Sequence, residues 1–80
     1  MPKIAYDVQH INDILEYKSH DMAQMYYACN RLTWLKKFRK APIEVVNALV
    51  IKCTAVLDGS WYGDEPEERT ISEYLNGKGV

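Results

Sequence analysis

The sequence predicts an all-α fold, a small bundle of three to four helices in a single domain over residues 1–80. Apolar residues recur at helical spacing through most of the chain. Prolines, glycines and short polar side chains fall between these apolar runs, where helices begin and end. The chain has 80 residues, 48% of them hydrophobic, which is the size and apolar content of one globular domain.

The first apolar stripe indicates helix over about residues 8–39, after Asp7, whose short side chain suits a helix N-cap. Lys18 interrupts the stripe, and poor helix formers follow it. One interpretation is a long helix, and the other is two helices broken near this interruption, with Ser19 or Asp21 capping the second. We favour a continuous or gently kinked helix, because the stripe keeps its phase. The stripe consists of Val8, Ile11, Leu15, Met22, Met25, Cys29 and Leu32.

A buried helix is predicted over about residues 42–58. The residue before a proline avoids the α region, so a boundary precedes Pro42, which itself suits a first helical turn. Gly59 suits the left-handed position after a helix. The β-branched content leaves a strand as a weaker alternative, but the length and the end signals favour a helix. Two adjacent stripes would bury most of its circumference: Ile43, Val46, Val50, Cys53 and Leu57, and beside them Val45, Leu49 and Val56.

A loop and a short C-terminal helix, over about residues 66–76, complete the predicted bundle. Two pairs have capping-box spacing, Asp64 with Glu67 and Thr70 with Glu73. The longer helices are expected to pack antiparallel, because their connections are short.

Charge is distributed in two blocks, although the net charge is only −1. Residues 31–40 contain five basic residues and no acid, whereas residues 58–73 contain six acids and one base. The blocks either neutralise each other in the fold or form two separate binding faces.

Cysteine use and hydropathy predict a cytoplasmic protein without a membrane segment. Cys29 and Cys53 lie on apolar stripes and are interpreted as free thiols in a reducing compartment. The N-terminal residues contain no apolar run typical of a signal peptide. The longest apolar stretch, residues 45–51, is too short to span a bilayer.

Catalytic and metal-binding patterns do not stand out, so we expect no enzyme, no cofactor and no metal site. His10 and His20 are too far apart on a helix to chelate one ion, and the cysteines lack zinc-site spacing. The acids of residues 64–68 are crowded in a loop, which indicates a solvated face rather than a catalytic pair.

The basic block also carries aromatic residues, which makes it the first candidate binding site. Trp34 and Phe38 are four positions apart and share a helix face, and Tyr27 and Arg31 continue that row. Such a strip suits a protein groove with acidic rims, or a phosphate backbone with stacked bases. Alternatively, the rings cover the core and the cations interact with the helix C-terminus.

The second candidate is Trp61–Tyr62, a pair of large aromatic residues in a loop between two glycines. They either plug a gap in the core or anchor a partner. The candidate partner-binding residues are therefore Tyr27, Arg31, Trp34, Lys37, Phe38, Arg39, Lys40, Trp61 and Tyr62.

Together these features predict a small non-enzymatic adaptor or inhibitor that docks on a larger protein, a profile common among viral and mobile-element accessory proteins. The alternative is a nucleic-acid binder that uses residues 31–40, although the near-neutral charge and the pI of about 6.1 disfavour it. A homodimer is also expected, because a first helix of roughly 45 Å would extend beyond the helix that covers it.

Overall fold

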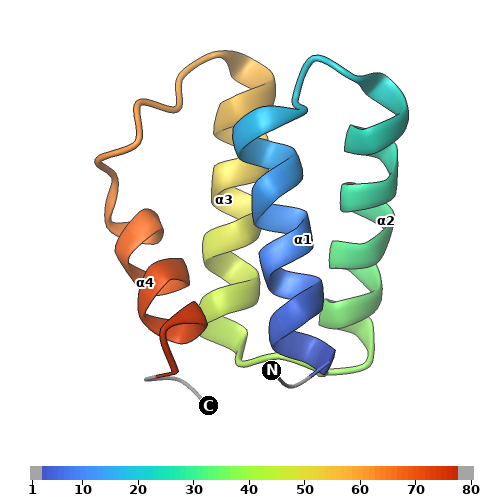
Figure 1. Cartoon of the computed structure of the whole chain (residues 1–80), viewed down its shortest axis with the longest axis vertical. Coiled ribbons are helices and arrows are strands. Elements are labelled where there is room, and N and C mark those ends of the chain that lie inside the picture. The colour runs from blue at the N-terminus through green and yellow to red at the C-terminus, as the bar shows by residue number, and fades with distance from the viewer. Residues whose placement is uncertain (1–2, 78–80) are drawn as a thin grey trace.

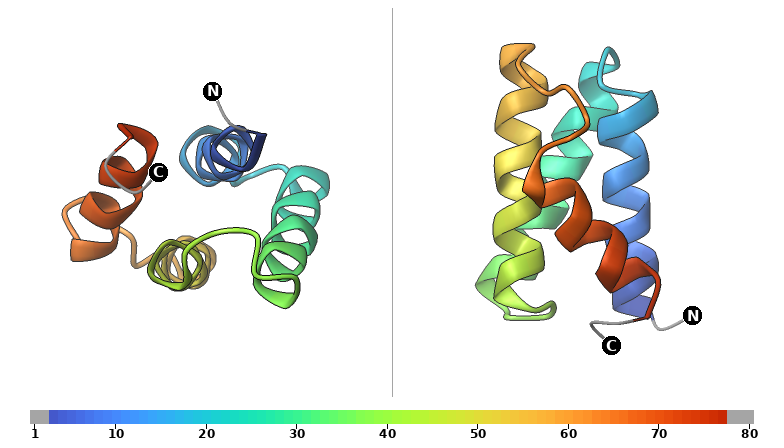
Figure 2. Two further views of the ribbon diagram at one scale, coloured as in Figure 1. Left: turned by 90° about the horizontal axis from the view of Figure 1, so that it is seen from below. Right: turned by 90° about the vertical axis from the view of Figure 1, so that its left-hand side faces the viewer.

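The computed structural model describes residues 3–77, which form four helices and no strand. Helix α1 spans Lys3–Tyr17, α2 spans Met22–Lys37, α3 spans Ile43–Asp58 and α4 spans Pro66–Leu75. In Figure 1, α1, α2 and α3 lie side by side, and consecutive helices run in opposite directions. The shorter α4 crosses α1 and α3 obliquely on the side away from α2 (Figure 2). The predicted all-α bundle is confirmed.

The preference for a continuous first helix was wrong, and the two-helix interpretation is correct. The chain reverses over residues 18–21, and the Asp21 carboxylate accepts hydrogen bonds from the backbone N–H groups of Ala23, at 3.0 Å, and Gln24, at 3.3 Å. This cap satisfies donors that begin α2. Folding back lets the apolar stripes of α1 and α2 cover each other, which one straight helix would not allow.

The predicted N-cap at Asp7 was also wrong. Helix α1 already begins at Lys3, so Asp7 lies within it and its carboxylate faces α2 instead of the helix end.

The core forms where the apolar faces of all four helices meet. Helix α1 contacts each of the other three helices, and α3 lies between α2 and α4. The buried hydrophobic residues are Ala5, Val8, Ile11, Ile14, Leu15, Met25, Ala28, Leu32, Leu35, Val45, Val46, Ala48, Leu49, Cys53, Ile71 and Tyr74.

Helix α3 begins and ends as predicted, which excludes the strand alternative. Pro42 precedes its first residue, and Gly59 follows its last residue with a φ of 74°. That left-handed conformation is free of strain only for glycine.

Neither predicted capping box forms at α4. The helix begins with Pro66 in its first turn, and Glu65 is the N-cap residue without a side-chain cap bond. The Glu65 carboxylate instead accepts hydrogen bonds from the backbone N–H groups of Tyr62, at 3.1 Å, and Gly63, at 2.9 Å. The Glu65 side chain therefore holds the loop that precedes the helix by hydrogen bonds.

The lengths of the helices bear on two other expectations. Over residues 3–77, none is long and apolar enough to cross a membrane. The excess length that led us to expect a homodimer is absent, because the first predicted helix is two shorter ones. Self-association would instead depend on exposed apolar residues of α2 and α3, among them Met22, Tyr26, Val50 and Leu57.

Candidate functional site

One row runs along α2 and onto its C-cap residue, as the spacing predicts. It consists of Tyr27, Arg31, Trp34 and Phe38. Arg31 is fixed within this row: its Nη2 lies 2.6 Å from Asp7 Oδ2, and its guanidinium lies 4.0 Å from the centre of the Trp34 ring. The Trp34 ring is partly buried against the core, and its centre lies 5.9 Å from that of Phe38. Arg31 and Trp34 therefore pack against neighbouring side chains and do not project from the exposed face of α2.

Exposed groups occur at both ends of this row. Tyr27 is 47% exposed, and it meets His10 of α1 edge to face at 5.4 Å between ring centres. Phe38 is 53% exposed, and Lys37 Nζ lies 5.5 Å from its ring.

The end of α2 presents four exposed cations, Lys36, Lys37, Arg39 and Lys40, around Phe38. The backbone N–H of Arg39 donates to the Lys36 carbonyl at 3.3 Å, and that of Lys40 donates to the Leu35 carbonyl at 3.0 Å. This hydrogen-bond pattern places Arg39 in the left-handed region, with a φ of 52°. Glycine is the usual residue there, and a side chain costs about 1–2 kcal/mol. Arg39 is thus a strained residue in the middle of the basic cluster.

A pocket of about 550 Å³ opens between α2 and α3 beside this cluster. Leu35 and Val46 are fully buried beneath it, whereas Lys36 and Arg39 contribute cations to its lining. This pocket is not evident from the sequence, because it depends on how the turn brings Ile43 next to the end of α2. No sequence signal indicates it, because Arg39 lies beyond the end of α2 in the left-handed conformation.

Trp61 and Tyr62 do not join the aromatic row of α2. Their loop connects α3 to α4 near one end of the bundle, whereas the basic cluster lies at the opposite end (Figure 1). The predicted site is therefore two separate surfaces.

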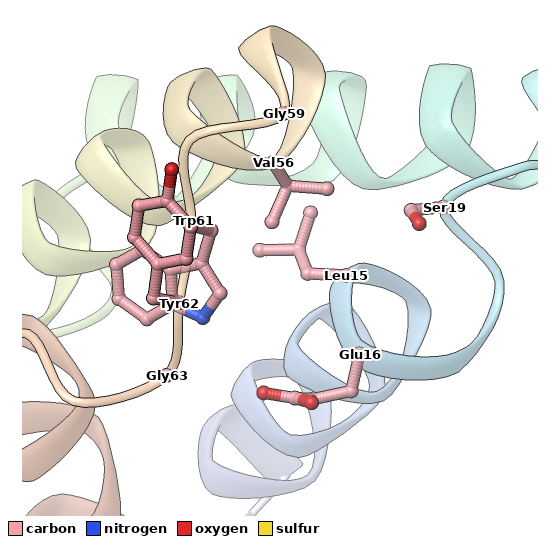
Figure 3. Close-up of a pocket in the computed structure, with 8 residues that line it drawn as sticks. All are labelled: Leu15, Glu16, Ser19, Val56, Gly59, Trp61, Tyr62 and Gly63. Carbon is pink, nitrogen blue, oxygen red and sulfur yellow. The ribbon is translucent and has the colours of Figure 1, made fainter.

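The Trp61–Tyr62 loop lines a second pocket, of about 360 Å³, with Leu15, Glu16 and Val56 (Figure 3). Trp61 is partly buried, and its Nε1 is buried without a hydrogen-bond partner among residues 3–77. Tyr62 is 82% exposed. Trp61 thus plugs a gap in the fold, and only Tyr62 is free to anchor a partner.

Lys52 lies beneath Trp61 and is the polar centre of the fold, which the sequence analysis missed. Its side chain is fully buried, and its Nζ donates to Asn12 Oδ1 at 2.7 Å, to Glu16 Oε1 at 2.7 Å and to Glu68 Oε2 at 2.9 Å. The Trp61 ring centre lies 5.3 Å from Nζ. Lys52 therefore joins three helices and the loop. Its sequence signal was a lone cation on the buried face of the most apolar segment.

The basic and acidic blocks do not neutralise each other. Among residues 3–77, no ion pair joins residues 31–40 to residues 58–73. Arg31 pairs with Asp7, and Glu68 pairs with the buried Lys52. The basic cluster and the acidic helix α4 lie on opposite sides of α1 and α3 (Figure 2), so they present two separate charged faces.

Possible metal ligands do not gather in the described part of the chain, where no three His, Cys, Asp or Glu side chains are placed to hold an ion.

Compared with known proteins, the chain matches no family model, no curated protein and no solved structure. The function must therefore be inferred from the surface of the molecule itself.

Proposed function

We propose that this protein is a small non-enzymatic adaptor or inhibitor that docks on a larger protein through the basic end of α2. The observation that carries the proposal is the apolar pocket between α2 and α3, which has Lys36 and Arg39 in its lining, at the end of α2 where Phe38 is also exposed. An apolar anchor surrounded by polar and charged groups is the usual composition of a protein-binding hot spot.

The pocket favours a protein partner over a nucleic acid. Its lining includes the exposed Ile43 and the partly exposed Ala41 above the buried core, which suit an apolar side chain from a partner. The surrounding cations suit carboxylates that flank such a side chain. A phosphate backbone would use the cations but would leave the apolar pocket unfilled. The partner segment is therefore expected to combine an apolar anchor with acidic neighbours.

Arg39 supports the same location. Its left-handed conformation costs stability that glycine would not, yet it adds a cation next to the pocket. Strain of this kind is often found at functional sites, where it is offset elsewhere in the fold.

Two matched double variants test the proposal in affinity capture followed by mass spectrometry. Lys37→Glu with Phe38→Ala removes a cation and an exposed ring from the proposed surface. Lys18→Glu with Tyr17→Ala makes the same change in charge near the opposite end of the bundle, where Tyr17 is 73% exposed. Circular dichroism is used to check that both variants remain folded. We expect the first variant to lose a stoichiometric protein partner at least tenfold, and the second to keep it.

Nuclease treatment separates the two candidate functions. Recovery that survives nuclease supports a protein partner. Recovery that collapses, together with an affinity for generic polynucleotides that falls steeply with salt, would favour the nucleic-acid alternative. Equal recovery by the two double variants would contradict the proposed location of the binding surface.

A further inference from the structure

Two cysteines face each other across α2 and α3. Cys29 lies on α2 and Cys53 on α3, and their Sγ atoms are 3.6 Å apart with both thiols free. The sulfurs of a disulfide are about 2.05 Å apart, so a bond between them requires an approach on the order of 1.5 Å. At 3.6 Å the two sulfur atoms are already in van der Waals contact.

Solvent reaches this pair. Both cysteines line a pocket of about 360 Å³ together with Thr33, Val50 and Thr54. Cys29 is partly exposed, whereas Cys53 is buried. A small hydrophilic oxidant therefore has access to the Cys29 sulfur without unfolding of the bundle.

We propose that Cys29 and Cys53 are a modification site at which a peroxide closes an intramolecular disulfide between α2 and α3. The Cys29 sulfur attacks a peroxide oxygen and the O–O bond breaks. The Cys29 thiol proton leaves with the released oxygen, as water when the oxidant is hydrogen peroxide, and Cys29 becomes a sulfenic acid. The Cys53 sulfur then attacks the Cys29 sulfur, the S–O bond breaks, and hydroxide leaves with the Cys53 proton as a second water. The two sulfurs together lose two electrons, which the peroxide gains.

The order of attack follows from the difference in exposure. Burial, followed by the neighbouring Cys29 thiol, raises the pKa of Cys53 to about 11. Because the thiolate is the reactive form, Cys53 reacts slowly with a dissolved oxidant at neutral pH. Cys53 is instead placed to resolve a sulfenic acid that forms on Cys29, with which its thiol is already in contact.

The bond would join residues that are 24 positions apart and would link α2 to α3 covalently. A cross-link of this length stabilises a fold mainly by restricting the unfolded chain. With thiols already in position, the oxidised protein is expected to melt roughly 10 °C above the reduced protein.

The test is the intact mass of the purified full-length chain after dilute hydrogen peroxide, with iodoacetamide added under denaturing conditions. We expect a loss of about 2 Da without alkylation, reversed by dithiothreitol, after which two alkyl groups are added per chain. Disulfide-linked dimers, or oxygen addition without the mass loss, would overturn the proposal. A disulfide that leaves Tm unchanged or lowers it would overturn the inference that the thiols are already in position.

Single variants test the order of attack. Cys53→Ala should leave a sulfenic acid on Cys29 that dimedone traps, and Cys29→Ala should react with peroxide at least tenfold more slowly. Equal rates in the two variants would contradict Cys29 as the attacking residue. The wild-type mass measurement does not depend on how well either variant folds.

Discussion

At the scale of single residues, Lys52 shows how one charge is accommodated in a small core. Its ammonium group is fully buried, but three oxygen acceptors satisfy its three N–H donors, and two of those acceptors are carboxylates. Because Glu16 and Glu68 retain partial exposure, they meet the buried charge without being fully desolvated themselves. The arrangement satisfies the charge within the fold and also joins α1, α3 and α4.

Removing this charge alone should destabilise the protein. We expect Lys52→Met to lower the free energy of unfolding by about 1–3 kcal/mol, below the full cost of breaking a buried pair because the carboxylates can turn toward water. Urea denaturation measures the change. The triple variant that adds Glu16→Gln and Glu68→Gln should recover much of the loss. If Lys52→Met were neutral by itself, the network would not be structurally important.

Glu65 is a second residue whose charge has a structural task. The backbone N–H groups of the preceding loop, Tyr62 first, hold the pKa of Glu65 below its usual range. A carboxyl group whose pKa is lower in the folded state stabilises that state above its unfolded pKa, and this contribution is lost as the pH falls through the folded pKa. The loop is therefore expected to loosen as the pH falls below the ordinary glutamate range.

Trp61 fluorescence reports on this loosening, because Trp61 lies in the same loop. In a Trp34→Phe background, we expect the emission of Trp61 to be constant at neutral pH and to shift as the pH falls below roughly 4. In Glu65→Gln the acid transition should weaken, since the titrating group is absent. Identical acid titrations of the two proteins would show that Glu65 does not control the loop.

At the scale of the element, the two ends of α2 have opposite effects on stability. Its N-terminus has a side-chain cap, Asp21, and its C-terminus ends in a left-handed residue that is not glycine. The first feature stabilises the reversal of the chain after α1, and the second strains the surface proposed to bind a partner.

Loss of the cap should therefore be measurable. We expect Asp21→Ala to lower the free energy of unfolding by about 1 kcal/mol, with a corresponding fall in Tm of roughly 4–8 °C. Asp21→Ser is the control, because a serine oxygen also accepts hydrogen bonds from the first turn, and it should remain close to wild type. A fall in Tm of the same size in both variants would mean that the cap is not the cause.

The other end of α2 should respond in the opposite direction. We expect Arg39→Gly to raise the free energy of unfolding by about 0.5–1 kcal/mol, because glycine adopts the left-handed conformation without strain. Lys37→Gly removes the same charge from the last turn of the helix and should lower stability by about 0.5–1 kcal/mol. Thermal denaturation by circular dichroism measures both. Destabilisation by Arg39→Gly would contradict the strain at this position.

At the scale of the whole molecule, separation of charge is the main property. The described part measures 30 × 25 × 20 Å, and the basic cluster and α4 lie on opposite sides of it (Figure 2). Since the Debye length at physiological ionic strength is about 8 Å, each face is largely screened from the other. Each face is therefore available to an oppositely charged surface on another molecule.

This separation predicts self-association that depends on salt. Near the pI of about 6.1, the net charge is too small to keep copies apart, and the basic face of one copy can meet the acidic face of the next. We expect light scattering at low ionic strength to give a mean mass above that of one chain, which falls as salt is added. A mass of two chains that salt does not change would point to the apolar residues of α2 and α3 instead. A single-chain mass under all conditions would contradict both forms of association.

Features that depend on neighbouring residues were determined by the sequence itself. The limits of α3 and of α4 agree with the prediction to within one residue. For α3 the reason is local, because Pro42 restricts the backbone before the helix and Gly59 readily adopts the left-handed conformation that ends it. The fold class follows from the helical spacing of apolar residues in the same local way. The aromatic row of α2 was also predictable, since residues four apart share a face on any helix.

The remaining features were decided by the tertiary structure alone, because they depend on which side chains from distant parts of the sequence meet in the fold. The spacing of apolar residues continues in phase across residues 18–21, so only the burial gained by folding α2 back on α1 decides between one helix and two. Lys52 is an ordinary lysine in the sequence, and it became the centre of the core only when Asn12, Glu16 and Glu68 arrived from two other helices. The pocket beside Arg39, the contact between Cys29 and Cys53, and the separation of the aromatic surfaces arise in the same way. Each of these features depends on the packing of helices that are distant in sequence. The sequence alone does not reveal them, because burial and charge pairing act between residues that only the folded chain brings together.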